Sequence, residues 1–474
     1  MWRVGLLLCC AVGCSGLESS PVATVIGFPI DNGEVDSLSV TGLTLVPAYS
    51  RTILDYYVRC ADGDNTIDVS VTSAGRTLIH TYTLVPNDAV QVADYWIRCL
   101  PPDFPVIGVT THPELGAPTP GYYLVNSGPY VAALDTNGTP VWYEPTTSGG
   151  DVDSLQPNVI SYLPNAEYPF AIDDAPSFQI ADLAAGTSTT LTSPDAPTNE
   201  HELQRLANGD YLMFADQVTP HVDLEELGYG ADAYVADCKI EELDPAGNLV
   251  WSWLGSDHID IVGENMLTTT TMSGLLTLVD AIHCNSIDIG PDNDLLVSAR
   301  HTSAIYDIDR ATGTIRWKLG GTPVTKDGEA YLAVVDDPFA GFNLQHDARF
   351  LANGDITLYD DHGLYGMRDG GLARGLELAL DHDAGTARIV WQVFGREESE
   401  YMGSFRRYAD GDSVIGWGYL VGDPVILTEV DGDANDVLDI SFQADITFAA
   451  LTYRAIKVPV TQLDHTLLRA TAAR

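Results

Sequence analysis

Short runs of alternating hydrophobic and polar residues, separated by turns that contain glycine, make up most of the chain. From residue 119 onward one unit recurs: an apolar strand, an Asp, a Gly-bearing turn and a second strand that ends on Trp. It reads ALDTNGTPVW, ELDPAGNLVW, DIDRATGTIRW and ALDHDAGTARIVW, and ends at Trp142, Trp251, Trp317 and Trp391. Alternation with a period of two predicts strands, and a short turn with Gly between two strands predicts a β-hairpin.

A second hairpin unit alternates with the first. It reads HELQRLANGDYLMFAD from His201, HCNSIDIGPDNDLLVSAR from His283, QHDARFLANGDITLYDD around His346, and SFRRYADGDSVIGWG from Ser404. Two hairpins make one four-stranded blade, and repetition of such units is typical of β-propellers. The sequence therefore predicts an all-β fold with a six-bladed β-propeller over residues 119–474, and the spacing of the Trp residues leaves five or seven blades open.

The first part of the chain follows a different pattern. Val, Thr, Ile and Tyr dominate its short alternating runs, so a small N-terminal β-sandwich with its linker is expected over residues 14–118. LPPDFPVIG, residues 100–108, predicts an extended linker because proline disfavours helix. Residues 266–280 fit either a short helix or an inserted loop, and the apolar tail at residues 445–460 is expected to supply a strand that closes the ring.

The start of the chain resembles a bacterial lipoprotein signal. One Arg precedes a short apolar run that ends in Ala-Val-Gly-Cys, so removal of residues 1–13 and lipidation of Cys14 are expected. A plain secretory signal is the alternative. Either reading places the protein outside the cytoplasm, as a periplasmic or cell-surface protein, and Ser15 after the lipidated Cys favours the outer membrane. No other apolar run has the length of a membrane span.

An exported protein can form disulfides. Cys60 and Cys99 lie in near-copies, YYVRC and YWIRC, and we expect them to pair. Cys238 and Cys284 either pair with each other or stay as buried thiols. The sequence has no Cys-x-x-Cys motif, which argues against a structural zinc site.

The net charge of the chain limits the classes of molecule that it can bind. The net charge is −44, from 67 acidic and 23 basic residues. Nucleic-acid binding is excluded because it needs basic residues to neutralise phosphates, and docking on anionic lipid is disfavoured. Membrane attachment would therefore depend only on the N-terminal lipid. Since an anionic ligand would be repelled from most of the surface, a local cluster of Arg and His would mark its binding site.

Three His residues hold the same place in successive repeats. His201, His283 and His346 each precede the turn of their hairpin, so we expect them to converge at the mouth of the central channel, with Arg300 one strand after His283. His301 follows Arg300 directly and should point to the other face of the strand. Any one of these His residues alone also fits a packing role between blades.

This constellation leaves three functions open. Three His can hold a catalytic zinc, which would make the protein a hydrolase. A neutral His can instead accept a sulfuryl or phosphoryl group, while a second His protonates the leaving group and an Arg fork binds the oxyanion. A non-catalytic exported propeller that binds a partner protein is the third possibility, because DIDRATGTIRW is close to structural Trp repeats of such proteins.

The motifs HCNSI, SARH, SAIYDIDRATGTIRWKLGG and FNLQHDARFLANGDITLYDD resemble the bacterial arylsulfate sulfotransferase family over roughly residues 105–460. The resemblance implies a six-bladed propeller preceded by a small β-sandwich. It also implies transfer of a sulfuryl group from an aryl sulfate ester to a phenolic acceptor, in a ping-pong reaction through a sulfohistidine. No nucleotide sulfate donor, metal or other cofactor is implied.

The resemblance also implies a role for each residue of the motifs. His346 would be the nucleophile. His283 and Arg300 would bind the sulfuryl oxygens, with His283 also handling the leaving proton, and His201 would complete the oxyanion pocket. Asn285 is a weaker candidate for substrate binding, with a turn-stabilising side chain as the alternative. The natural donor, the natural acceptor and the oligomeric state stay open.

Overall fold

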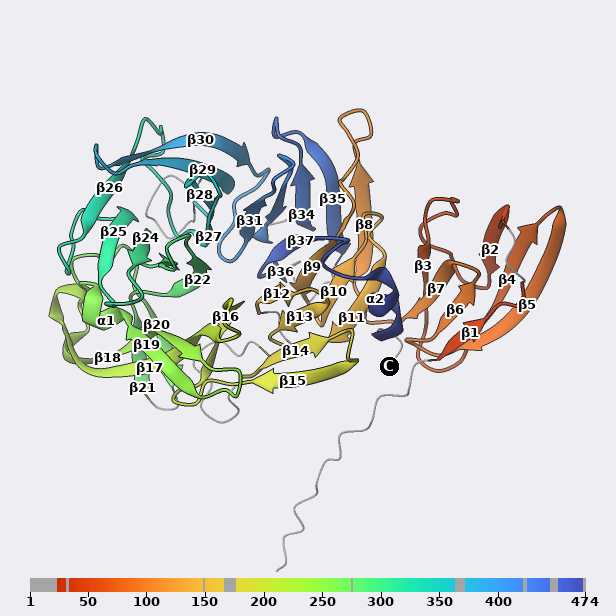
Figure 1. Cartoon of the computed structure of the whole chain (residues 1–474), viewed down its shortest axis with the longest axis horizontal. Coiled ribbons are helices and arrows are strands. Elements are labelled where there is room, and N and C mark those ends of the chain that lie inside the picture. Colours follow the sequence, from red (N-terminus) through yellow and green to blue (C-terminus); the bar gives the residue numbers. More distant parts are fainter. Residues whose placement is uncertain are drawn as a thin grey trace, which may run out of the picture.

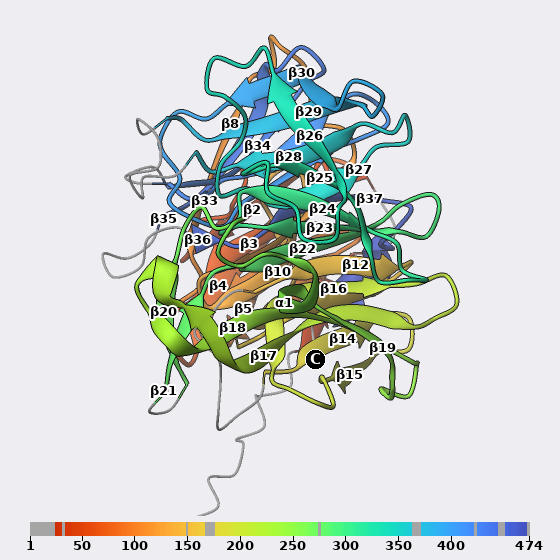
Figure 2. The same ribbon diagram turned by 90° about the vertical axis from the view of Figure 1, so that its left-hand side faces the viewer.

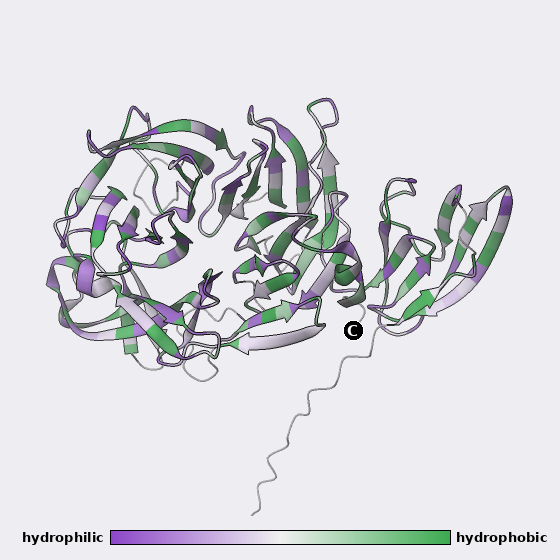
Figure 3. Ribbon diagram, viewed as in Figure 1, coloured by the Kyte–Doolittle hydropathy of each residue, from purple (hydrophilic) through white to green (hydrophobic). Residues whose placement is uncertain are grey.

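The computed structural model describes residues 24–30, 34–147, 150–165, 176–273, 276–362, 371–420, 424–443 and 451–471. Strands account for almost all of the regular structure in these ranges, so the prediction of an all-β fold is confirmed. Figure 1 shows the sheets from residue 121 onward arranged in a ring, with the sheets of β1 to β7 to one side. Along most strands, hydrophobic residues are interrupted by polar ones, as the alternating pattern of the sequence requires (Figure 3).

The N-terminal strands form two sheets around one core. One sheet has the order β1-β6-β7-β3 and the other β2-β4-β5. Alternate residues of β4 are buried, and its Val69 and Val71 share a hydrophobic cluster with Tyr56 and Ile97 of the first sheet. A disulfide joins Cys60 to Cys99, the pair expected from the sequence. The bounds are β1 Val25–Gly27, β2 Ser37–Thr41, β3 Asp55–Arg59, β4 Asn65–Ser73, β5 Arg76–Leu84, β6 Ala89–Val92 and β7 Tyr95–Leu100.

The repeats fold into successive antiparallel meanders of four strands each. Every Trp-bearing hairpin predicted from the sequence supplies the third and fourth strands of such a meander. The meanders are β37 (Ala455–Pro459), β9 (Gly121–Ser127), β10 (Tyr130–Leu134) and β11 (Pro140–Pro145); β12 (Val152–Gln156), β13 (Val159–Tyr162), β14 (Phe178–Asp182) and β15 (Thr187–Leu191); β16 (Thr198–Arg205), β17 (Tyr211–Leu224), β18 (Gly230–Leu243) and β19 (Leu249–Leu254); β22 (Cys284–Ile289), β23 (Leu295–Ala299), β24 (Ala304–Ile308) and β25 (Ile315–Gly320); β27 (His346–Phe350), β28 (Ile356–Asp360), β29 (Arg374–Asp381) and β30 (Thr386–Phe394); β31 (Ser404–Arg407), β32 (Ser413–Gly416), β34 (Val425–Val430) and β35 (Asp436–Gln443).

The first strands of these meanders contact one another in a closed circuit. Around the ring, β12 contacts β16, then β22, β27, β31 and β37 follow, and β37 contacts β12 again. The circuit is completed by a strand from the end of the chain, because β37 pairs antiparallel with β9. Residues 451–459 of the predicted tail therefore lie in the ring beside the first meander, whereas its residues 445–450 lie outside the described residues.

Several strands lie outside the repeats. β20 (Thr269–Ser273) and β21 (Leu276–Asp280) pair with each other, and β21 also pairs with the long strand β18 (Figure 2). Of the two alternatives for residues 266–280, the described part is therefore an inserted segment with strand structure and not a helix. β26 (Ala330–Val335) pairs in parallel with β25 and β30 and thereby links two meanders into a nine-stranded sheet. β33 (Gly418–Tyr419) pairs with β36 (Leu451–Thr452).

The linker predicted at residues 100–108 ends in a paired strand, which begins at Val106. β8 (Val106–Thr111) adds to the outer edge of the last meander by pairing with β35. At the other end of the chain, helix α2 (His465–Thr471) packs on β11. His465 and Arg469 of this helix contact the Asp55 carboxylate at 2.6 Å and 2.9 Å, which ties the N-terminal sheets to the ring.

The division into domains at residues 14–118 and 119–474 stays a prediction. The signal peptide at residues 1–13 and the lipidation site Cys14 lie outside the described residues. Within the described ranges, α1 (Gly255–His258) and α2 are far shorter than a membrane-spanning helix.

Candidate active site

The three His residues from the repeats lie at the same end of the inner strands. His346 is the first residue of β27, His283 immediately precedes β22, and His201 lies within β16. The rings of His201 and His283 contact edge to face, with 5.1 Å between their centroids. Only 3% of His346 and 7% of His201 is exposed, so the cluster is shielded from bulk water. The convergence expected from the repeats is therefore present in the fold.

A carboxylate from the β20–β21 hairpin holds two His rings. Asp280, the last residue of β21, is 2.6 Å from Nδ1 of His283, while its backbone carbonyl is 2.9 Å from Nδ1 of His301. The His301 ring stacks on that of His283 with 4.7 Å between centroids. Arg300 contacts Nε2 of His301 through Nη1 at 2.9 Å and donates to the Glu400 carbonyl through Nη2 at 3.1 Å. Arg300 thus reaches the cluster, as expected.

The expectation that His301 points away from the site is wrong. It assumed that the strand continues through Arg300, but β23 ends at Ala299 and residues 300–303 form a turn. In this turn the Ser303 amide donates to the Arg300 carbonyl at 3.1 Å. Strand alternation no longer applies there, so Arg300 and His301 both reach the same cluster.

His346 is oriented by a second buried carboxylate. Oδ2 of Asp361, the residue that follows β28, lies 2.8 Å from Nδ1 of His346. The Ser399 hydroxyl donates to the other oxygen of Asp361 at 3.3 Å. Burial raises the pKa of Asp361 well above its ordinary value. Since Nδ1 faces Asp361, the ring presents Nε2 to any substrate.

His201 is held by an amide instead. Oδ1 of Asn199 is 2.6 Å from Nδ1 of His201 and also accepts from the His201 backbone amide at 3.0 Å. Nδ2 of Asn199 donates to Asp216 at 2.7 Å. With Asn199 as acceptor, Nδ1 of His201 carries the proton and Nε2 has the lone pair. This hydrogen-bond pattern sets the tautomer of His201.

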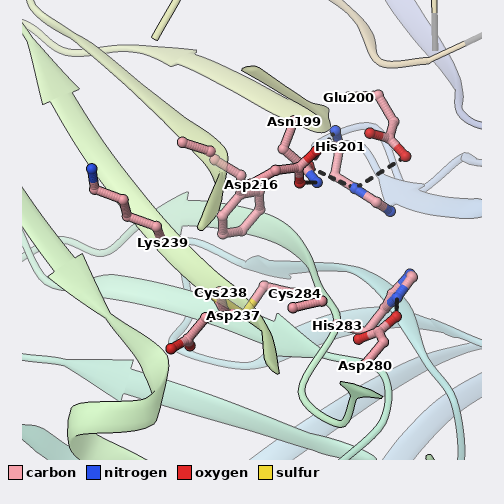
Figure 4. A pocket seen from close by; sticks show the side chains of 13 residues that line it. Asn199, Glu200, His201, Asp216, Asp237, Cys238, Lys239, Asp280, His283 and Cys284 are labelled. Atoms are coloured by element: carbon pink, nitrogen blue, oxygen red, sulfur yellow. Dashed lines mark hydrogen bonds and ion pairs between the residues drawn. A yellow bond between two sulfur atoms is a disulfide. The ribbon is translucent and has the colours of Figure 1, made fainter. Parts of the chain in front are cut away.

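A small side cavity adjoins the His cluster. It measures about 40 Å³, with Asn199, Glu200 and His201 on one side and Asp280 with His283 on the other (Figure 4). The disulfide between Cys238 and Cys284 forms part of its wall, so these cysteines are paired rather than free. Burial raises the pKa of both Glu200 and Asp216, and the charge of His283 offsets this only in part for Glu200.

The electrostatics of the cluster keep two of its imidazoles neutral. Burial lowers the pKa of His346 well below its ordinary value, and charge on Arg300, His283 and His201 lowers it further. The pKa of His201 is lowered for the same reason, burial first and then the charge of His283. Asp280 behaves in the opposite way: burial alone would raise its pKa, but His301 and His283 hold it below the usual value. His346 is therefore a deprotonated nitrogen base, and Asp280 an ionised carboxylate.

Asn285 supports the site from β22. Its side-chain amide donates to the Gln345 carbonyl at 2.7 Å, immediately before His346, and Oδ1 is buried without a hydrogen-bond partner among the described residues. The Tyr453 hydroxyl donates to the backbone carbonyls of both Asn285 and His201. Asn285 lies inside a strand, so a turn-stabilising role does not apply to it.

Directly beyond the His cluster lies a buried network of charges. Arg349 reaches Glu202 at 2.6 Å and Asp347 at 2.8 Å, and Arg406 binds Asp347 through Nε and Nη2 at 2.8 Å and 2.9 Å. Arg454 contacts Glu202 at 3.0 Å and also pairs with Asp151. These charges come from β16, β27 and β31 and from the residues directly before β12 and β37. Along β27 they follow His346, so they lie between the His cluster and the opposite end of the inner strands.

A model of the arylsulfotransferase (ASST) family matches residues 113–454. The chain belongs to the arylsulfotransferase family. The matched range contains every His and Arg of the cluster, as well as Asp280, Asp361 and Asn199. No curated protein matches the chain.

Solved structures similar to this arylsulfotransferase are distant. A protein of unknown function from Bacteroides caccae is 14% identical, with a TM-score of 0.42 over 72% of this chain and 99% of its own. The periplasmic gluconolactonase PpgL of Pseudomonas aeruginosa is 10% identical, with a TM-score of 0.39 over 72% and 99%. AztD of Citrobacter koseri is 10% identical, with a TM-score of 0.33 over 71% and 98%. No property of this chain follows from likenesses this remote.

The zinc alternative involves a different set of residues from the one expected. Among the described residues, the ligand atoms of Asp280, His283 and His301 lie within 4.8 Å of one another. That group contains only one of the three repeat His residues. The Nδ1 atoms of His283 and His301 already face Asp280, an arrangement that equally serves to orient two imidazoles.

Proposed function

We propose that this arylsulfotransferase moves a sulfuryl group from an aryl sulfate ester to a phenolic acceptor through a sulfated His346. The observation that carries the proposal is the state of His346: a buried, neutral imidazole whose Nδ1 faces Asp361, with Arg300, His283 and His201 close enough to depress its pKa. Such a nitrogen is a nucleophile, and the positive charge of Arg300 would stabilise the transferred anionic group.

In the first half-reaction, Nε2 of His346 attacks the sulfur atom of the donor. A nitrogen–sulfur bond forms as the bond between sulfur and the aryl oxygen breaks. The electron pair leaves with the aryl oxygen, which takes a proton from His283, whose Nδ1 faces ionised Asp280. Arg300 would bind the sulfuryl oxygens with its planar fork.

In the second half-reaction, the acceptor phenol gives its proton back to His283. Its oxygen attacks sulfur as the bond to Nε2 of His346 breaks, so the enzyme returns to its starting state. Because phenol and aryl sulfate each use the same site in turn, we expect ping-pong kinetics. His201 borders the pocket with an unprotonated Nε2 and takes no part in the proton transfer, because the single proton of the phenol passes to His283.

We further propose that the fold is a six-bladed β-propeller preceded by a β-sandwich domain. The closed circuit of first strands supports six blades, one for each meander. The core shared by the two N-terminal sheets supports the sandwich. A ring of this kind holds side chains from several blades at one end of its channel, which is where the His cluster lies.

Export as a lipoprotein on Cys14 is also a proposal. Two disulfides support it, since such bonds persist in oxidising compartments such as the periplasm. Small-molecule donors and acceptors would reach the enzyme there without a nucleotide carrier.

The test is release of nitrophenolate from 4-nitrophenyl sulfate by protein treated with a chelator. We expect release that depends on added phenol, and a protein mass increased by one SO₃ group when phenol is omitted. His346→Ala should abolish both, a loss of at least about 10³-fold, while its fold stays intact. The control is His221→Ala, which removes an exposed ring paired with Asp232.

Other outcomes would point elsewhere. Activity that appears only when zinc is restored would favour a hydrolase built on Asp280, His283 and His301. A sulfated protein mass in His346→Ala would show that another residue is the nucleophile.

A further inference from the structure

A second cavity lies at the opposite end of the inner strands. It measures about 360 Å³ and is much larger than the side cavity beside the His cluster. The strand β27 shows the order of the layers: His346 begins it at the His cluster, Asp347 and Arg349 belong to the charge network, and Phe350 ends it at this second cavity. We call it the distal cavity. The charge network separates it from the proposed site of sulfuryl transfer.

The distal cavity is rich in basic residues for so acidic a protein. Four of the 23 Arg and Lys residues line it, against two carboxylates, Asp153 and Asp288. Arg349 and Lys457 are fully engaged: Arg349 binds Glu202, Asp347 and the Ile287 carbonyl, and Lys457 binds Glu429 and Thr119. These two cations shape the cavity but have little capacity left for a ligand.

Arg406 and Arg407 differ from them, because each keeps donors that no described residue accepts. Arg406 donates to Asp347 through Nε and Nη2, and its Nη1 makes no hydrogen bond to the described residues. Arg407 approaches Glu377 only through Nε, at 3.1 Å, and its Nη1 is buried without a hydrogen-bond partner in the described structure. The guanidinium lies 4.3 Å from the centroid of Trp391, which fixes its plane.

A third donor lies on the same face of the sheet. The Thr357 hydroxyl is completely buried, lines the cavity, and has no partner among the described residues. Thr357 is directly opposite Arg349 on one side and Glu377 on the other, so its side chain faces the same way as theirs. Arg407 contacts Glu377, the residue directly opposite Thr357, so the Arg407 and Thr357 side chains line the cavity near each other. Buried donors without acceptors are costly, and a ligand that supplies acceptors would relieve this cost.

Part of the remaining wall is apolar, and the rest includes Ser154, Tyr408 and Gln462. Phe350, Leu351, Ile456 and Val458 line the cavity beside these donors. A volume of this size lies at the lower end of the range for small-molecule sites. The combination of an Arg fork, a hydroxyl and an apolar wall suits a compact organic molecule with one oxyanion group.

We propose that the distal cavity binds a small organic oxyanion, with its anionic group on Arg407 and Thr357 and its carbon skeleton against Phe350 and Ile456. Arg406 would add a further donor through Nη1. This site is separate from the His cluster and does not depend on sulfuryl transfer. An aromatic sulfonate or carboxylate has the required chemistry, whereas inorganic sulfate has only the anionic part.

The test uses 4-fluorobenzenesulfonate, which has no sulfate ester and so cannot donate a sulfuryl group. Calorimetric titration of the wild-type protein should show two sites, one at the His cluster and one in the distal cavity. Arg407→Gln should remove the second site, with affinity there reduced at least about tenfold, and leave phenol-dependent turnover unchanged. Arg300→Gln should leave the second site in place. Arg388→Gln, at an exposed ion pair with Asp336, is the matched control and should keep both sites.

Two further measurements keep the test decisive. Thr357→Val keeps the shape of the side chain and should weaken the second site even if Arg407→Gln folds poorly. Inorganic sulfate should compete at the second site much more weakly than benzoate. The proposal is overturned if wild-type protein binds the sulfonate only at the site that Arg300→Gln removes, or if Arg407→Gln and Thr357→Val both retain the second site; the distal cavity would then be a solvent-filled funnel.

Discussion

Two charged regions follow one another along the inner strands, and they use their charges in opposite ways. In the network of Arg349, Arg406 and Arg454, each guanidinium binds at least one carboxylate within about hydrogen-bond distance. In the His cluster, burial and neighbouring positive charge instead hold His346 and His201 in their neutral forms. Paired charges fix the strands around the channel, whereas imidazoles that resist protonation are available for reaction.

The difference shows what each region costs the fold. A buried ion pair contributes little net stability, but removal of one partner leaves an uncompensated charge in a dry site. His346 and His201 avoid this risk because they are neutral in the folded protein. A change in the network should therefore damage folding first, and a change in the His cluster should damage turnover first.

The largest expected effect is on stability, from Arg454→Met. This change leaves Glu202 and Asp151 without one of their cations, and burial already raises the pKa of Asp151 to about 8. We expect the free energy of unfolding to fall by about 3–5 kcal/mol, measured by urea denaturation. Arg388→Met at the exposed pair is the control. A loss no larger than that of the control would mean that the network is not structural.

The next effect is on turnover, from Arg300→Lys. Lysine keeps the positive charge but loses the planar fork, so transition-state oxygens would lose one of two parallel hydrogen bonds. We expect the rate of nitrophenolate release to fall by about 10²–10³-fold, while the free energy of unfolding changes by less than about 1 kcal/mol. A fall in stability as large as that of Arg454→Met would remove the distinction between the two regions.

The smallest effect concerns Asp216 beside the side cavity. Its pKa is raised in the folded protein, mainly by burial and then by Glu200, so the folded state holds a proton that the unfolded state releases at lower pH. Stability from this group is present below the unfolded pKa and is lost as the pH rises toward the folded pKa. Asp216→Asn removes this loss, so the gain in stability of the variant over wild type should grow as the pH is raised through the range from about pH 4 to pH 8.

The measurement for Asp216→Asn is a series of urea melts across that pH range. The exposed Asp257→Asn serves as control and should show a pH profile like that of wild type. A constant difference between Asp216→Asn and wild type at every pH would mean that Asp216 is ionised in the folded protein.

The repeats predicted most of the fold and the main members of the site, because both depend on local pattern. Each hairpin of the Trp unit forms where alternation and Gly-bearing turns predict it, and the register of the repeats brings His201, His283 and His346 together. Pairings between distant segments have no such local pattern. Neither the addition of β8 to β35 nor the parallel pairing of β26 could be derived from the residues alone.

The supporting residues of the site were missed for a related reason. Asp280 lies in a segment that fitted either helix or loop, so its approach to His283 depended on a hairpin that the pattern did not resolve. His301 was excluded by an alternation that ends one residue before Arg300. Asp361 had a local signal, a carboxylate directly after the strand that pairs with the one bearing His346, and that signal could have identified it.

The ring is completed by β37, so the site can form only when the C-terminal part of the chain is present. Tyr453 and Arg454, just before that strand, bind His201, Asn285 and Glu202 from other parts of the ring. A chain truncated before residue 451 would lack both the closing strand and these contacts. We expect such a chain to have no activity rather than reduced activity. In a circular permutant that places residues 451–471 directly before β9, the four strands of the first meander would be contiguous in sequence. Closure of the ring would then no longer require pairing between the two distant ends of the chain.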